Sequence, residues 1–283
     1  MPSIGKKKLE ELRRKIGEKE NLLVAFSGGV DSGFLLKVAH DVLGKERVLA
    51  VTVDSELFPR RELADLKDFL KHTDLSHKIV RFSWQRIDDF VKNPYNRCYY
   101  CKRECAKLLK DIAAKEGITT IAEGVTVSDV DEYRPGIVAS REEGILWHPL
   151  VEVGITKHEV RHLAKEIGLP FWDKPSSSCL ATRVEYGEWI TEERLKMIEA
   201  AEDFLKDRGF KQLRVRLHRG GIARIEVDKK ELNAFFDATI IEEVCRKLKA
   251  LGFNYVTLDL EGYRSGSMDD LHPPTNLARS DNL

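Results

Sequence analysis

The stretch Ala25-Phe26-Ser27-Gly28-Gly29-Val30-Asp31-Ser32 joins an apolar segment, 21–26, to an amphipathic one, 33–43. The first predicts a buried strand, and the second predicts a helix because its apolar residues recur at helical spacing. Two adjacent glycines let the backbone turn tightly and approach a ligand without a side chain in the way. The N–H groups and the dipole at the helix start then favour an anion. The stretch therefore predicts a strand, a phosphate-binding turn and a helix.

This turn is not one of the two best-known glycine-rich phosphate loops, because it contains neither G-x-x-x-x-G-K-S/T nor G-x-G-x-x-G. The segment SGGVDS, residues 27–32, instead resembles the pyrophosphate loop of the ATP-pyrophosphatase superfamily. Those enzymes cleave ATP between the α- and β-phosphates and adenylate a substrate. The alternative is an ordinary glycine turn, but six consecutive matching residues between a strand and a helix favour the ATP-binding interpretation.

Predicted strands at 22–26, 47–53, 77–82 and 119–122 alternate with predicted helices at 33–43, 60–72, 102–116 and 157–167. This alternation predicts a doubly wound parallel α/β sheet that binds ligands beyond the carboxyl ends of its strands. Composition changes near Tyr186, where strands 213–218, 223–227 and 255–260 begin to follow one another. We expect an ATP-binding domain over 1–184, a small α+β domain over 185–270 and a flexible tail over 271–283.

The composition excludes several classes of protein. The chain has 283 residues, of which 42% are hydrophobic, and 47 basic side chains balance 47 acidic ones. A net charge of zero gives no basic field for nucleic acid, so we expect no nucleic-acid partner. We also expect no membrane association, because no run of about 18 apolar residues occurs. The first twenty residues lack the apolar core of a signal peptide, which predicts a cytoplasmic protein.

Three of the five cysteines lie close together in sequence. Cys98-x-x-Cys101 fits a redox dithiol, half of a zinc site or part of an iron–sulfur site. Cys101 falls near the start of the helix predicted at 102–116, and a helix N-terminus favours the thiolate that binds metal. We expect Cys105 and the more distant Cys245 only to pack, as free cysteines often do.

Cys179 stands in a serine-rich loop, PSSSCLATR, rather than in a predicted helix or strand. Lys174 and Arg183 lie nearby in sequence, and positive charge favours a thiolate. Local features thus make Cys179 a candidate nucleophile, with a loop thiol of no role as the alternative.

The match to one family extends along the chain. Its segments are SGGVDS, NRCYYCK, EGVTVSDVDEYRPG, HPLVEVGITKHEV, PSSSCLATRVEYG, RVRLHRGGIARIEV and LDLEGYRSGS. In this order they resemble the LarE family over about residues 20–268. These are ATP-dependent sulfur transferases that help to build the nickel-pincer nucleotide cofactor of lactate racemase.

The resemblance implies a small-molecule substrate, pyridinium-3,5-dicarboxylate mononucleotide. ATP, with Mg²⁺, would adenylate one of its carboxylates, and a sulfur held by the protein would displace AMP to give the thiocarboxylate. This order is chemically reasonable, because a carboxylate is a poor electrophile and a thiolate is a strong nucleophile at neutral pH. The resemblance also implies a homo-oligomer, with a hexamer as the specific expectation.

The family's motifs imply roles for particular residues. The phosphate loop would consist of Ser27, Gly28, Gly29, Asp31 and Ser32. The nucleotide, its metal or its phosphates would lie near Asp54, Asp129, Arg134 and Lys157. Further anionic groups would bind to Arg183, Arg214, Arg216 and Arg264. Glu202 is a candidate metal-binding acid. Arg214 and Arg216 alternate on one strand and so share a face, which suits the substrate's phosphate. For each charged group the alternative is a solvated surface ion pair.

The sulfur source divides the family. Some members have one cysteine that gives up its own sulfur, whereas others have three and are thought to hold a 4Fe–4S cluster whose open iron carries sulfide. Cys98, Cys101 and Cys179 favour the cluster version here, with these residues as iron ligands and as the catalytic set. Two other functions remain open: a tRNA thiolase of the same superfamily, and a non-catalytic nucleotide- or iron–sulfur-binding module.

Overall fold

The computed structural model describes residues 4–130, 135–144, 146–175 and 177–269. Its contacts divide the chain into two compact units. The first unit comprises Met1–Ser55, Arg60–Trp84 and Cys98–Ser177, and the second comprises Glu56–Pro59, Gln85–Arg97 and Ser178–Leu283. The sequence did not predict that two short early segments group with the C-terminal part. The boundary after residue 184 stays a prediction, and the tail at 271–283 lies outside the described residues.

The first unit is built around a parallel sheet. Its elements are α1 (Ile4–Gly17), β1 (Leu22–Ala25), α2 (Val30–Leu43), η1 (Lys45–Arg47), β2 (Val48–Asp54), α3 (Arg60–Lys71), β3 (Ser76–Arg81), α5 (Arg97–Lys115), β4 (Ile121–Glu123), α6 (Val127–Val130), α7 (Pro135–Glu142), β5 (Leu146–Trp147), α8 (Pro149–Glu152) and α9 (Lys157–Glu166). The short helix η2 (Trp84–Arg86) begins in the first unit and ends in the second. The strand order β3-β2-β1-β4-β5, with every pair parallel, confirms the predicted doubly wound fold.

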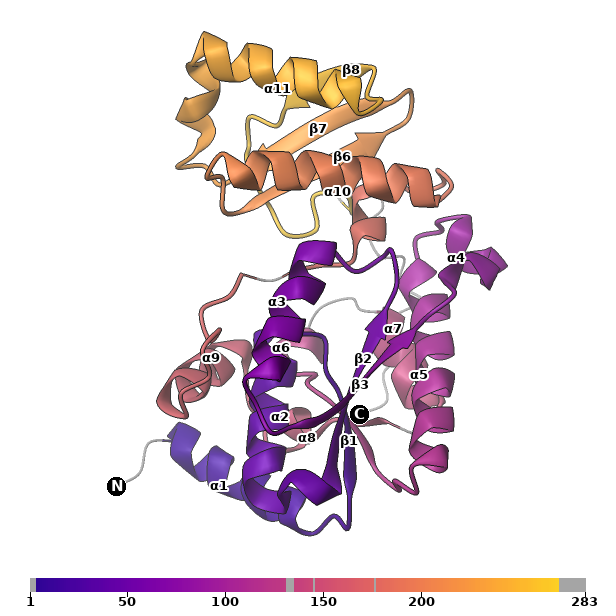
Figure 1. Cartoon of the computed structure of the whole chain (residues 1–283), viewed down its shortest axis with the longest axis vertical. Coiled ribbons are helices and arrows are strands. Elements are labelled where there is room, and N and C mark those ends of the chain that lie inside the picture. The colour runs from indigo at the N-terminus through magenta and orange to yellow at the C-terminus, as the bar shows by residue number, and fades with distance from the viewer. Residues whose placement is uncertain (1–3, 131–134, 145, 176, 270–283) are drawn as a thin grey trace. The chain divides into compact units, whose positions relative to one another are not determined.

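Helices cover both faces of this sheet, as Figure 1 shows, with α5 on one side and α2 and α3 on the other. On the α5 side, Leu109 and Ile112 pack against Leu23 and Val51 of the central strands. This packing explains why β1 and β2 are apolar along almost their whole length. The polar residues that follow β1, β2 and β4 are left at the carboxyl edge.

The predicted start of the helix at residue 102 is wrong. Helix α5 begins at Arg97, whose N–H donates to the carbonyl of Pro94 at 2.9 Å. The loop that the sequence predicts is therefore shorter than expected. Pro94 interrupts any helix that arrives from the preceding residues, and the new helix begins three residues later. Cys98 and Cys101 consequently lie on the first turns of α5, three residues apart on one helix face.

The second unit is a small α+β structure. Its elements are α4 (Asp88–Val91), η3 (Leu180–Arg183), α10 (Glu192–Asp207), β6 (Leu213–His218), β7 (Ile222–Val227), η4 (Leu232–Phe236), α11 (Ala238–Ala250) and β8 (Tyr255–Leu258). Strand β7 is central, antiparallel to β6 and parallel to β8. Helices α10 and α11 pack on this sheet and on each other. Helix α10 begins directly after Thr191, whose hydroxyl accepts a hydrogen bond from the N–H of Arg194 at 3.3 Å and so caps the helix.

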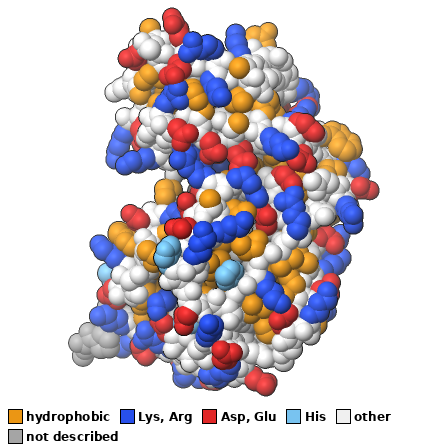
Figure 2. Space-filling model, viewed as in Figure 1, with side chains coloured by type: hydrophobic (Ala, Val, Ile, Leu, Met, Phe, Trp, Pro, Cys, Tyr) orange, Lys and Arg blue, Asp and Glu red, His pale blue; other side chains and the backbone are white. Residues whose placement is uncertain are grey.

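The surface carries charge of both signs. In Figure 2, acidic and basic side chains are interspersed over the visible face, in line with a net charge of zero. Within the part of the chain that the structure describes, no helix is long and apolar enough to cross a membrane.

Candidate functional site

The phosphate turn between β1 and α2 has the backbone that its glycines predict. Gly28 has φ +71°, and a Cβ there would lie 3.0 Å from Cδ1 of Leu66. Gly29 is the N-cap of α2 and supplies no side-chain hydrogen bond to the first helical N–H groups. These groups and the positive end of the dipole are therefore suited to an anion.

Two hydroxyls hold this turn closed. The Ser27 N–H donates to Oγ of Ser32 at 3.2 Å, and the two serine oxygens lie 3.0 Å apart. Gly124, just after β4, passes so close that a Cβ would lie 2.7 Å from the backbone nitrogen of Ser32. The start of α2, which includes Asp31, is thus bordered by the backbone of the loop after β4, where a side chain would collide with the helix.

The predicted nucleotide residues beyond this turn are engaged within the first unit. Asp54 ends β2 and lies 2.7 Å from the Arg60 guanidinium. Asp129 is buried and accepts hydrogen bonds from the N–H and hydroxyl of Thr126, and its other oxygen lies 2.9 Å from Nζ of Lys157. The structure therefore pairs two predicted ligands, Asp129 and Lys157, with each other. Arg134 lies outside the described residues.

A second feature of the first unit is a polar cluster between α5 and the end of β4. Glu123 is buried, forms an ion pair with Lys102 and lies 3.5 Å from Nε2 of His148. Burial alone would raise the pKa of Glu123, but Lys102 and His148 outweigh it and lower the pKa to about 2. In turn, Glu123 raises the pKa of Lys102 in spite of burial.

The cysteines of α5 adjoin this cluster. Cys98 is exposed, whereas Cys101 and Cys105 are half-buried. A hydrogen bond with Cys101 lowers the pKa of Cys105, and Lys102 assists. The expectation that Cys105 only packs missed this contact, although the i, i+4 spacing of the two thiols on a helix was a usable signal.

Cys179 belongs to the second unit, where Arg183 organises the backbone around it. Cys179 immediately precedes η3, and its carbonyl accepts from the Thr182 hydroxyl at 2.7 Å and from Nη1 of Arg183 at 3.1 Å. The same Arg183 nitrogen donates to the carbonyl and hydroxyl of Ser178. The loop of the candidate nucleophile is therefore fixed by a buried guanidinium.

That guanidinium is paired with Glu202, the predicted metal-binding acid. Nε of Arg183 donates to Oε1 of Glu202 at 2.9 Å, and the Val215 N–H donates to the same oxygen at 3.1 Å. Burial raises the pKa of Glu202, but Arg183 outweighs it and keeps the pKa below the ordinary value. The carboxylate is thus ionised and occupied by protein donors, and its role as a metal ligand stays a prediction.

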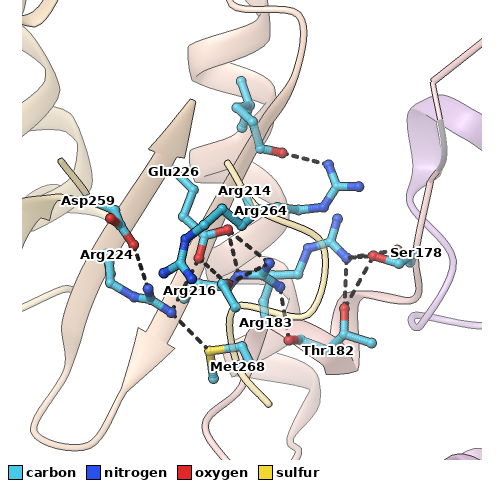
Figure 3. A network of polar contacts seen from close by, with 12 residues as sticks. Ser178, Thr182, Arg183, Arg214, Arg216, Arg224, Glu226, Asp259, Arg264 and Met268 are labelled. Carbon is cyan, nitrogen blue, oxygen red and sulfur yellow. Dashed lines mark hydrogen bonds and ion pairs between the residues drawn. The ribbon is translucent and has the colours of Figure 1, made fainter. Parts of the chain in front are cut away.

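One face of the sheet in the second unit carries the charged side chains of β6 and β7, and the other face carries their apolar side chains. The register places Arg214 opposite Glu226 and Arg216 opposite Arg224. Figure 3 shows Arg216 and Arg224 directed toward Glu226, at 2.9 and 3.2 Å. We call Arg183, Arg214, Arg216, Arg224 and Glu226 the arginine face.

Three arginines of the arginine face are buried, contrary to the alternative of solvated surface ion pairs. Arg183, Arg214 and Arg216 are 1%, 7% and 5% exposed. Burial, with a smaller effect of the neighbouring Arg183, lowers the pKa of Arg214 to about 10. Arg264 belongs to the polar network that Figure 3 draws, and it forms an ion pair with Glu261 at 2.7 Å.

Residues just before Cys98 are bound within the second unit, which the sequence did not predict. The buried Asn93 amide donates to the carbonyls of Val184 and Glu185 at 3.2 and 2.8 Å. Arg97 stacks on the Tyr186 ring, 4.4 Å from its centroid. The segment before Cys98 is therefore anchored to the segment that follows Cys179.

The predicted residues thus form two groups. The phosphate turn, Asp54, Asp129 and Lys157 lie in the first unit with Cys98 and Cys101, whereas Cys179, Arg183, Glu202, Arg214, Arg216 and Arg264 lie in the second. Among the described residues, no three His, Cys, Asp or Glu side chains are gathered in a way that could hold a metal ion. Cys98 and Cys101, one helical turn apart, offer two soft thiolate donors of the kind that iron–sulfur clusters use.

Comparison with known proteins adds to this geometry. Residues 6–113 match the model of the NAD synthase family. The chain is 37% identical over 259 residues to the pyridinium-3,5-bisthiocarboxylic acid mononucleotide synthase of Lactiplantibacillus plantarum, with 92% of each chain covered. It is 40% identical to an uncharacterized protein of Synechocystis sp., covering 93% of this chain and 97% of the relative. A GMP synthase of Chlamydia caviae is 26% identical, over 59% of this chain and 35% of that enzyme.

Proposed function

Because the chain belongs to the family of pyridinium-3,5-bisthiocarboxylic acid mononucleotide synthases, the LarE family, we propose that it is an ATP-dependent sulfur transferase. Its substrate would be pyridinium-3,5-dicarboxylate mononucleotide, and its product the corresponding thiocarboxylate. The observation that carries this proposal lies in the second unit. There the loop of Cys179 is fixed on the arginine face, because Arg183 binds the Cys179 carbonyl and Arg216 binds that of Thr182 at 3.2 Å.

In the first step, a substrate carboxylate oxygen attacks the α-phosphorus of ATP, and pyrophosphate leaves. The N–H groups of the phosphate turn and the α2 dipole would stabilise the charge on the leaving pyrophosphate. Mg²⁺, when bound, would neutralise the same charge. Asp54 and Asp129 supply carboxylate oxygens, the ligands that Mg²⁺ prefers, and Lys157 supplies a cation next to Asp129.

In the second step, sulfur attacks the acyl carbon, the new C–S bond replaces the C–O bond to the phosphate, and AMP leaves with the electron pair. We propose that Cys98, Cys101 and Cys179 are the catalytic thiols and that they hold a 4Fe–4S cluster, which would supply the sulfide. The pair on α5 and the fixed loop of Cys179 support this assignment. The arginine face would bind the substrate's phosphate through Arg214 and Arg216. We further propose a homo-oligomer, as in the family expectation.

The test is an anaerobic reaction with ATP and the dicarboxylate mononucleotide, followed by chromatography of AMP and of the thiocarboxylate. We expect both products from the wild-type protein. Cys179→Ser should release pyrophosphate and stop at the acyl adenylate, with no thiocarboxylate and no matching release of AMP. A tRNA substrate that triggers AMP formation in place of the mononucleotide would contradict the proposal. Iron content measures the cluster: Cys98→Ser should lower it, whereas Cys245→Ser on α11 should not. A Cys98→Ser protein with full iron content would exclude the three-cysteine cluster.

A further inference from the structure

Among its described residues, the second unit buries several arginines. Arg97, Arg183, Arg214 and Arg216 are less than 9% exposed, and the buried carboxylates in this part of the chain are those of Glu202 and Glu226. Glu202 binds Arg183, and Glu226 binds Arg216. An isolated charge in the interior is costly unless a partner compensates it. A buried arginine that lacks a carboxylate partner therefore indicates a place for an anionic ligand.

Arg97 is the clearest case. The residue is 4% exposed, and within the described part of the chain its Nε and Nη1 are buried without a hydrogen-bond partner. Its guanidinium stacks on the ring of Tyr186 at 4.4 Å, and no described carboxylate forms an ion pair with it. Stacking on an aromatic ring holds the guanidinium plane while its N–H groups stay available to an acceptor.

The segment 267–269 connects the surroundings of Arg97 to the arginine face. The Tyr186 hydroxyl donates to Asp269, and the hydroxyl of Ser267, two residues earlier, donates to Glu226. Glu226 in turn binds Arg216. Two residues of extended chain span at most about 7 Å. The segment 267–269 therefore contacts the ring on which Arg97 stacks at one end and the carboxylate that binds Arg216 at the other.

We propose that Arg97 binds a carboxylate on the pyridinium ring of the substrate while the arginine face binds its phosphate. The inference rests on the proposed function and names a residue that selects the dicarboxylate. The substrate has two carboxylates, and adenylation consumes the charge of only one. Arg97 directly precedes Cys98 in the chain and would hold the second carboxylate while the first reacts. The planar guanidinium matches a carboxylate better than an ammonium does.

The test compares two ligands by isothermal titration calorimetry: the 3,5-dicarboxylate mononucleotide and nicotinic acid mononucleotide, which has one carboxylate. Wild-type protein should bind the dicarboxylate at least about tenfold more tightly, in line with one charge-assisted hydrogen bond. Arg97→Gln should bind both with nearly equal affinity, and Arg97→Lys should keep part of the preference. The control Arg219→Gln, an exposed arginine that pairs with Glu188, should keep the wild-type ratio.

Three results would overturn the proposal. An unchanged ratio in Arg97→Gln would show that Arg97 has only a structural role, and AMP formation by that variant would show that the proposed function still holds. If the wild-type protein binds neither nucleotide, the assignment falls together with the proposed function. A thermal unfolding midpoint far below that of wild type in both Arg97 variants, with the ratio intact in Arg97→Lys, would also assign Arg97 to structure.

Discussion

Gly28 illustrates how single residues shape the phosphate turn. Its φ of +71° lies where a Cβ strains the backbone, and Leu66 already occupies the adjacent space at 3.0 Å. We predict that Gly28→Ala loses most ATP affinity, because the turn must shift to relieve both effects. The left-handed conformation alone should lower the free energy of unfolding by about 1–2 kcal/mol. Equilibrium urea unfolding and nucleotide titration measure the two effects.

A matched control separates strain from function. Gly117 has φ +66°, but a Cβ there would meet nothing within 4 Å. Gly117→Ala should therefore lose a similar amount of stability from backbone strain and keep its ATP affinity. Equal loss of ATP affinity in both variants would show that destabilisation, and not the shape of the turn, explains the effect.

At the scale of the helix and strand, the sequence predicted the elements well and their ends less well. The apolar runs of β1 and β2 and the helical spacing of apolar residues in α2 were sufficient to predict these elements. Their own side chains are the ones that are buried, so the burial pattern is visible in the local sequence. The start of α5 was missed because Asn96 and Arg97 give weak local signals, whereas the hydrogen bond to Pro94 sets the first turn. The buried contacts of Arg97 and Asn93 depend on residues about ninety positions away, which no local pattern contains.

The Lys102–Glu123 pair, which ties α5 to the end of β4, predicts a pH dependence of stability. The folded-state pKa of Glu123, about 2, lies below its ordinary value of 4.5, so the unfolded chain binds the proton more readily. The stabilisation is therefore present above about pH 4.5 and is lost as the pH falls toward 2. Glu123→Gln should be less stable than wild type by roughly 3 kcal/mol at pH 7.

The difference in unfolding free energy between wild type and Glu123→Gln should shrink toward zero as the pH approaches 2. Urea unfolding across the acid range measures it. Glu116→Gln is the control, because Glu116 pairs with Lys78 at the surface, where both side chains are more than a third exposed. Its effect should stay within about 1 kcal/mol at every pH. A constant difference between Glu123→Gln and wild type from pH 7 to 3 would contradict the assigned pKa.

At the scale of the molecule, the chain leaves the first unit and returns to it before the C-terminal part begins. Segment Gln85–Arg97 groups with the second unit although its neighbours in sequence belong to the first. Asn93 anchors this segment. It is fully buried with φ +56°, its amide binds two carbonyls, and its own carbonyl accepts from Gly187 at 3.0 Å. Asn93 thus anchors, in the second unit, the segment that ends at Arg97, directly before Cys98 of the first unit.

We predict that Asn93→Gly and Asn93→Ala both weaken this anchor, by different amounts. Glycine adopts the left-handed backbone and loses only the amide. The Val184 carbonyl then loses its donor, whereas that of Glu185 still accepts from the Glu188 N–H, and the loss costs about 1–3 kcal/mol. Alanine adds strain of about 1–2 kcal/mol. Urea unfolding should therefore rank wild type above Asn93→Gly and Asn93→Ala below both. If Cys98 must be held by this segment to share iron with Cys179, iron content should fall in the same order while ATP affinity stays unchanged. Full iron content in Asn93→Ala would show that the anchor contributes to folding alone.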